Sequence, residues 1–295
     1  MITYAASLGS FDRYFNEKLR NAFGICDLKK VETQLWGELP DNEENNAALA
    51  LLHQAVADGD IVPVSAHMPF YGGGMRWDPS ALEEDIRKDV VSRMSRLMLD
   101  NPDLLGGHVT LHASNEPPME THPARIIQCR RSLEELMPVA EKLDISINVE
   151  YLPRTCLGNC EEELEALVDG FPGKYIGICL DVNHIMHRYR ELPAIIRRLA
   201  PRLKSFHICD YDGVDEMHWF AGQGIIRWDE VMAAIKEIPH DVLLISETMY
   251  QLGEKVSHVA DPVFAIRQTE DSFYFLENCK EIMQAREKFR KSLAQ

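Results

Sequence analysis

Short apolar runs alternate with longer amphipathic segments along the whole chain. This alternation is typical of repeated strand and helix units, in which a buried parallel strand is a brief run rich in Val, Ile and Leu. Eight such runs predict eight strands, which are Ile2–Ala6, Lys30–Leu35, Ile61–Ala66, Gly107–Leu111, Ile145–Val149, Tyr175–Leu180, Lys204–Ile208 and Val242–Ser246.

The segments between these runs carry helix signals. The clearest start is Asp78-Pro79 with Glu83 and Glu84 after it, because Asp can cap a helix, Pro suits its first position and acidic residues favour its positive end. Further helices are predicted at Glu43–Ala57, Pro123–Leu143, Cys160–Val168, Leu192–Leu199 and Trp228–Glu237. A last helix near Asp271–Leu293 is expected to be an appendage outside the ring.

Eight strands alternating with helices over 295 residues predict an α/β fold, a single (β/α)8 TIM barrel with a C-terminal helical appendage. Neither a linker nor a charge block suggests a boundary, so we expect one domain over residues 1–295. A doubly wound sheet is the alternative. It is disfavoured because Ser7-Leu8-Gly9-Ser10, after the first predicted strand, lacks the Gly-rich dinucleotide fingerprint.

Charge and cysteine content narrow the partners and the compartment. There are 31 Lys and Arg residues against 47 Asp and Glu residues, a formal net charge of −16, which repels phosphate backbones and anionic membranes. The seven scattered cysteines do not resemble the disulfide framework of a short secreted domain. We also find neither a signal peptide nor an apolar stretch of about 18 residues. We therefore expect a cytoplasmic protein that binds neither membranes nor nucleic acid.

Six consecutive predicted strands end in a His, Asp or Glu, namely His67, His112, Glu150, Asp181, His207 and Glu247. Strand ends carry the catalytic groups of TIM barrels, so these side chains should meet at one mouth. Carboxylates and imidazoles gathered in a low-dielectric pocket destabilise one another unless a cation neutralises them. The sequence therefore predicts a divalent metal. Mixed oxygen and nitrogen ligands suit Mn²⁺, Zn²⁺, Co²⁺ or Fe²⁺ better than Ca²⁺, which prefers a cage of oxygen ligands, and Mg²⁺ is also left open.

Loop residues beyond the strand ends add candidates. His184 follows Asp181 by three residues, so we expect it in the same site as a metal ligand or a substrate contact. Glu216 and His218 are further possible metal or substrate ligands, with a solvated loop as the alternative. Trp77 and Arg227 are predicted to contact the substrate near the mouth.

One set of residues carries a family resemblance, namely Glu150, Asp181, His184, His207, Glu247 and the loop Gly222-Gln223-Gly224-Ile225-Ile226-Arg227-Trp228. In these positions the chain resembles the xylose isomerase-like TIM-barrel superfamily, from Tyr4 to about Glu247. That superfamily includes sugar phosphate isomerases and epimerases, D-tagatose 3-epimerase, inosose dehydratase and endonuclease IV.

The epimerase branch implies one metal held by the four residues Glu150, Asp181, His207 and Glu247. The two glutamates would also move a proton on opposite faces of the substrate through an enediolate, which fits metal-assisted acid and base catalysis. The resemblance further implies that His184 contacts a substrate oxygen. One departure concerns substrate binding, because the epimerases carry an Arg six residues after the strand-seven His, where this chain has Gly213.

The endonuclease IV branch implies three zinc ions bound by nine side chains, and this chain offers His67, His112, Glu150, Asp181, His184, His207, Glu216, His218 and Glu247. Glu216 stands where that family has Asp. The charge of −16 and the lack of a basic face oppose duplex binding.

Together, these observations predict a metal-dependent sugar or sugar-phosphate isomerase or epimerase that takes a small-molecule substrate, with a monomer and a homo-oligomer both open. A multinuclear zinc phosphodiesterase and an inosose dehydratase-like lyase are the alternatives.

Overall fold

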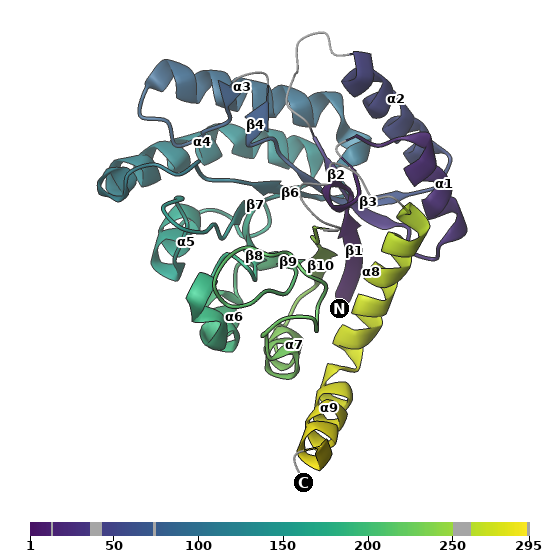
Figure 1. Cartoon of the computed structure of the whole chain (residues 1–295). Coiled ribbons are helices and arrows are strands. Elements are labelled where there is room, and N and C mark those ends of the chain that lie inside the picture. Colours follow the sequence, from purple (N-terminus) through teal and green to yellow (C-terminus); the bar gives the residue numbers. More distant parts are fainter. Residues whose placement is uncertain (13, 36–42, 73–74, 250–260, 294–295) are drawn as a thin grey trace.

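Eight parallel strands form a closed barrel in the computed structural model, which describes residues 1–12, 14–35, 43–72, 75–249 and 261–293 (Figure 1). Around the ring, the strands are β1 (Ile2–Ser7), β2 (Lys30–Gln34), β3 (Val62–His67), β6 (His108–Leu111), β7 (Ser146–Glu150), β8 (Ile176–Asp181), β9 (Leu203–Ile208) and β10 (Val242–Ser246), and β10 pairs with β1. The predicted (β/α)8 fold is confirmed, and each predicted strand end lies within one residue of the observed end.

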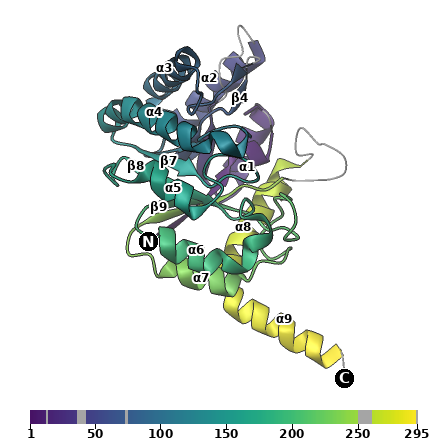
Figure 2. The same cartoon turned by 90° about the vertical axis from the view of Figure 1, so that its left-hand side faces the viewer.

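Helices surround the barrel on its outer side (Figures 1 and 2). They are α1 (Glu17–Ile25), α2 (Glu43–Ala57), α3 (Glu84–Asp100), α4 (His122–Leu143), α5 (Glu161–Val168), α6 (Leu192–Leu199), α7 (Trp228–Lys236), α8 (Pro262–Glu277) and α9 (Cys279–Leu293). Helix α1 was not predicted, although its start signal is visible in the sequence: the Asn16 side chain accepts a hydrogen bond from Leu19 N at 3.0 Å. None of the helices in the described ranges has the length and apolar character needed to span a membrane.

The helix predicted to begin at Asp78 begins six residues later, at Glu84. The Asp78 carboxylate accepts hydrogen bonds from the backbone and the hydroxyl of Ser80 and pairs with Arg125 at 2.8 Å. Asp side chains favour such local turns as well as helix caps. The sequence signal was therefore real, but it marks a turn ahead of the helix.

The C-terminal segment forms two helices rather than the single predicted appendage. Helix α8 packs against α1 and α7 as the last helix of the barrel, and the chain breaks at Asn278 before α9. Only α9 extends away from the barrel (Figures 1 and 2). A short hairpin of β4 (Tyr71–Gly72) and β5 (Met75–Arg76) follows β3.

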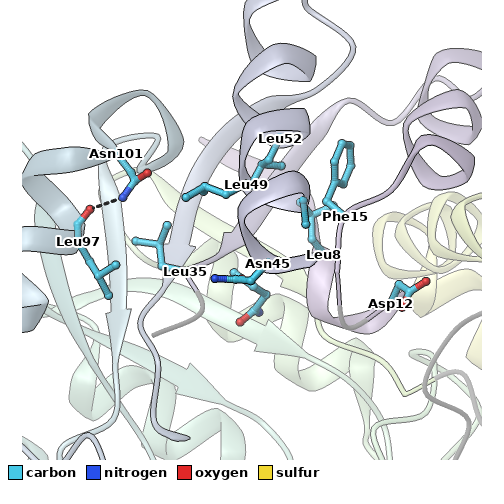
Figure 3. A pocket seen from close by; sticks show the side chains of 11 residues that line it. Leu8, Asp12, Phe15, Leu35, Asn45, Leu49, Leu52, Leu97 and Asn101 are labelled. Atoms are coloured by element: carbon cyan, nitrogen blue, oxygen red, sulfur yellow. Dashed lines mark hydrogen bonds between the residues drawn. The ribbon is translucent and has the colours of Figure 1, made fainter. Parts of the chain in front are cut away.

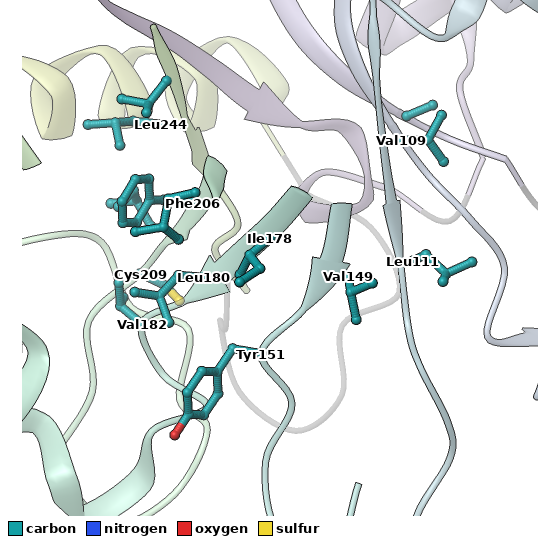
Figure 4. Close-up of a cluster of buried hydrophobic side chains, with 14 of the residues drawn as sticks. Val109, Leu111, Val149, Tyr151, Ile178, Leu180, Val182, Phe206, Cys209 and Leu244 are labelled. Atoms are coloured by element: carbon teal, nitrogen blue, oxygen red, sulfur yellow. The ribbon is translucent and has the colours of Figure 1, made fainter. Parts of the chain in front are cut away.

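The main core lies between the strands and the helices. It includes Val149 of β7 and Phe206 of β9 (Figure 4). Because side chains alternate between the two faces of a strand, the intervening residues face the barrel interior. Several of these are polar, and Asn148 on β7 donates a hydrogen bond to Ser205 Oγ on β9 across the interior, at 3.4 Å. The barrel axis therefore carries a polar layer that leads up to the strand ends.

Candidate metal centre and active site

The six predicted strand-end residues come together at the C-terminal mouth of the barrel. A pocket of about 510 Å³ opens there, and its lining includes His67, His112, Glu150, His184, Glu216, His218 and Glu247. Asp181 and His207 are fully buried beneath it. The structure thus brings together all nine predicted metal-ligand candidates.

The centre of the site is a cluster of three carboxylates around one imidazole. Nδ1 of His207 lies 3.1 Å from Glu150 Oε1, 3.0 Å from Glu247 Oε2 and 3.8 Å from Asp181 Oδ2. One ligand atom from each of these four residues lies within 4.8 Å of the others. Each side chain comes from the end of a different strand, from β7 to β10, so the closed sheet fixes their relative positions.

The donor set fits a divalent cation. Asp181 Oδ2 is buried and makes no hydrogen bond to any described group, whereas Asp181 Oδ1 accepts one from Asn183 N at 2.7 Å. A buried carboxylate oxygen without a partner is costly unless a cation satisfies it. Three carboxylates with one imidazole match the ligands preferred by Mn²⁺, Zn²⁺, Co²⁺ and Fe²⁺.

Burial and mutual charge shift the pKa values in this cluster strongly. Burial acts to raise the pKa of Glu150, but His112 and His207 hold it well below its ordinary value. Burial likewise opposes the shift at Glu247, whose pKa is lowered by His207. Burial would lower the pKa of His67, yet the Glu150 carboxylate raises it to about 9. Without a cation, the protonated rings of His67 and His207, whose pKa values are both raised by the neighbouring carboxylates, supply the positive charge that keeps the glutamates ionised.

Two more histidines of the set lie around Glu150. Its Oε2 is 2.9 Å from His112 Nε2 and 3.3 Å from His67 Nε2. A second group, formed by Asp181, His184 and His218, also offers three ligand atoms within 4.8 Å of one another.

Backbone carbonyls orient three of the histidines. Nδ1 of His67 lies 2.8 Å from Met68 O, Nδ1 of His184 lies 2.8 Å from Tyr151 O, and Nδ1 of His218 lies 3.0 Å from Glu247 O. A carbonyl can only accept, so in each neutral ring the proton sits on Nδ1 and the lone pair on Nε2. Each of these rings therefore presents Nε2 as its ligand atom.

Glu216 joins the site through a charged bridge at the rim. Its Oε2 is 3.9 Å from His184 Nε2, and its Oε1 is 2.6 Å from Arg154 Nη1. Arg154 also pairs with Glu116 at 2.5 Å and Asp215 at 3.5 Å, which links the loops after β6, β7 and β9. Sequence spacing pointed to Glu216 but not to Arg154 as its partner.

Two predicted substrate contacts lie elsewhere. Trp77 is buried at 2% exposure and does not line the pocket, because the chain after the hairpin turns the indole into the core. Arg227 is 59% exposed, pairs with Asp229 at 2.8 Å and borders a different cavity beside α9. Neither side chain lines this pocket, since a residue's distance along the chain from a strand end does not fix where its loop directs the side chain.

With this geometry established, we compared the chain with known proteins. A family model described as xylose isomerase-like TIM barrel matches residues 27–268. The chain belongs to this family. The predicted family resemblance is thereby confirmed.

A curated relative of this xylose isomerase-like chain is the uncharacterized protein MJ1311 of Methanocaldococcus jannaschii, which is 26% identical over 192 residues. The match covers 63% of this chain and 64% of that protein, so the chain spans less than two thirds of its relative's length.

Two solved structures show the same fold. D-psicose 3-epimerase from Clostridium cellulolyticum H10, in a structure with D-tagatose, has a TM-score of 0.72 at 16% identity and covers 93% of this chain and 98% of its own. The IolI protein with a bound zinc atom has a TM-score of 0.69 at 16% identity, with the same coverage. At these identities the likeness establishes the fold alone.

Sequence reasoning missed Glu32 in this xylose isomerase-like barrel. It lies within β2, is fully buried, and its Oε2 is 3.2 Å from His207 Nε2. The only signal was a carboxylate inside an otherwise apolar predicted strand, and strand parity alone does not identify its partner across the barrel.

A second cavity, of about 40 Å³, is mostly apolar (Figure 3). Leu35, Leu49 and Leu52 face it together with Phe15, and its polar groups do not form a catalytic cluster. The chemistry of the described residues is therefore concentrated at the barrel mouth.

Proposed function

We propose that this protein is a divalent-metal-dependent isomerase or epimerase of a sugar or sugar phosphate. The observation that carries the proposal is the cluster of Glu150, Asp181, His207 and Glu247 at the floor of a pocket large enough for a small polyol. Structural similarity to sugar epimerases supports the choice of substrate class.

The two glutamates are suited to proton transfer. Glu150 is 1% exposed and Glu247 is 25% exposed, and both line the pocket while also facing His207. Removing a proton from a carbon next to a carbonyl leaves an enediolate, and returning it on the other face or to the neighbouring carbon gives the epimer or the isomer. A bound divalent metal would act as a Lewis acid that stabilises the negative charge developing on a substrate oxygen.

Other side chains would hold the substrate. His184 presents Nε2 to the pocket because its Nδ1 is tied to Tyr151 O, so it is placed to bind a hydroxyl or carbonyl oxygen. Gln34 and Asn115 also line the pocket and offer amide groups to further hydroxyls.

The test is solvent deuterium exchange into candidate ketoses and aldoses and their phosphates, with the metal content measured on the same samples. We expect about one Mn, Fe, Co or Zn ion per chain and a rate of exchange that falls about 10²- to 10⁴-fold in Glu150→Gln and Glu247→Gln. The matched control is Glu237→Gln, because Glu237 is 55% exposed and pairs with Arg197 on the outside of the barrel. Exchange at the native rate in both pocket variants would contradict the proposed acid and base roles.

A second candidate function is a multinuclear zinc phosphodiesterase. It is favoured by the additional group of Asp181, His184 and His218, whose histidines are already oriented through Nδ1. About three zinc ions per chain and cleavage of abasic-site DNA would support it over the isomerase. A dehydratase would instead be recognised by a product that lacks one water molecule relative to the substrate.

A further inference from the structure

The proposed reaction leaves one fully buried carboxyl group inside the barrel, that of Glu32, without a role. Glu32 is 0% exposed and lies within β2, one layer below the metal-ligand candidates. Burying a carboxylate is costly unless hydrogen bonds or a positive charge compensate it. A fully buried carboxylate directly beneath a cluster of three others therefore requires an explanation in terms of what it binds.

One oxygen of Glu32 is held in place by neighbouring strands. Its Oε1 accepts hydrogen bonds from Ser65 Oγ on β3 at 2.9 Å and from Thr110 Oγ1 on β6 at 3.1 Å. Both hydroxyls are fully buried, so water does not compete with them. These two bonds fix the plane of the carboxylate and direct Oε2 toward the centre of the barrel.

The other oxygen faces His207 across the barrel interior. Glu32 Oε2 lies 3.2 Å from His207 Nε2, and among the described residues neither atom makes a well-aligned hydrogen bond. Buried polar atoms without partners are rare, and a small rotation of either side chain would align this pair. The contact joins β2 to β9, which are not neighbours in the sheet.

The two nitrogens of His207 thus have different tasks. Nδ1 points at the carboxylates of Glu150 and Glu247, whereas Nε2 points at Glu32. Histidines that bind metals generally donate their second N–H to a carboxylate or carbonyl, which fixes the orientation of the ring. His67, His184 and His218 use backbone carbonyls in this way, whereas the group that faces Nε2 of His207 is the side chain of Glu32.

We propose that Glu32 is a positioning residue that orients the His207 ring by accepting a hydrogen bond from Nε2, so that Nδ1 faces the metal centre. This inference rests on the metal centre of the proposed function. Glu32 does not line the pocket, and its effect is transmitted through the orientation of one ligand.

The test is titration of the metal-free full-length protein with Co²⁺, followed by its visible absorption spectrum. We expect Glu32→Met to raise the Kd for Co²⁺ about 10- to 100-fold and to change the spectrum at saturation, because the ring loses its support. Glu32→Gln should give a smaller increase, since its amide oxygen can still accept from Nε2. The matched control is Thr33→Val, which alters the next residue of the same strand, whose hydroxyl donates to Leu104 O instead.

Each outcome is decisive. Wild-type protein that does not bind Co²⁺ would overturn the proposed metal centre itself. Binding by Glu32→Met with the native Kd and spectrum would overturn only the positioning role, as would an equal loss in Thr33→Val. If circular dichroism shows that Glu32→Met does not fold, Glu32→Gln decides, and a native Kd and spectrum in that variant would likewise overturn the proposal.

Discussion

At the scale of single residues, the two ends of β6 show how neighbours decide the state of a histidine. His108 starts the strand and His112 follows its end, and burial lowers the pKa of both. At His112 the carboxylate of Glu150 opposes the shift, whereas at His108 the charge of Lys204 adds to it and the pKa falls to about 4. His108 is therefore neutral in the folded protein, at the end of the barrel opposite the pocket.

This neutral histidine predicts a pH-dependent stability. The pKa of His108 is 6.5 when unperturbed and about 4 when folded, so between these values the unfolded chain binds a proton that the folded protein does not. Within that range, this group should lower the free energy of unfolding by about 1.4 kcal/mol for each unit by which the pH falls. Above pH 6.5 it should have no effect. Urea unfolding of wild type and His108→Gln between pH 4 and pH 7 checks this. Identical slopes in the two proteins would contradict it.

At the scale of elements, the strands and five of the helices were predictable to within one residue at each end, whereas α1, the start of α3 and the break between α8 and α9 were not. A buried parallel strand is a short run of mostly apolar residues, and such a run can be recognised from consecutive positions in the sequence. A helix start depends on which backbone group a capping side chain reaches. The Asp78 carboxylate accepts a hydrogen bond from Ser80 N within a turn and does not cap the helix. The strand-end ligands followed from the strands, but Glu32 depended on contacts across the barrel and Trp77 on the path of a loop.

The part of helix α9 beyond Met283 is exposed, whereas its first turn packs on the core. Cys279 is buried, while Phe289 is 63% exposed and Leu293 is 71% exposed. We expect deletion of residues 287–295 to change the free energy of unfolding by about 0.5 kcal/mol or less, because it removes little buried area. Thermal melts at several protein concentrations check this. A larger loss that depends on concentration would instead support a homo-oligomer with the exposed apolar residues of α9 in its interface.

At the scale of the whole molecule, the mouth concentrates negative charge on a chain that is already acidic. The net charge is −16, and the three carboxylates of the central cluster come from β7, β8 and β10, which lie within four consecutive strands of the ring. Closing the barrel brings these carboxylates together, so their electrostatic repulsion lowers the free energy of unfolding of the whole barrel. Stability of the fold and occupancy of the site are therefore linked.

Metal removal should lower the melting temperature. A ligand present at 100 times its Kd stabilises the folded state by about 2.7 kcal/mol, which for a protein of this size corresponds to roughly 5 to 10 °C. Calorimetry of chelated protein with and without added Mn²⁺, Co²⁺ or Zn²⁺ measures the shift. Glu150→Gln is the control in which the shift should shrink, and equal melting temperatures for chelated and metal-loaded wild type would rule out this linkage.

The backbone supports of three histidines have a consequence for sequence drift. The carbonyls of Met68, Tyr151 and Glu247 persist whatever side chain stands at those positions, so no single substitution there deletes the acceptor. The support of His207 is a side chain and can be lost in one codon change at Glu32. During divergence, a single substitution at Glu32 could therefore weaken the central site while His67, His184 and His218 keep their orientation. Those three rings would then remain available to a different reaction.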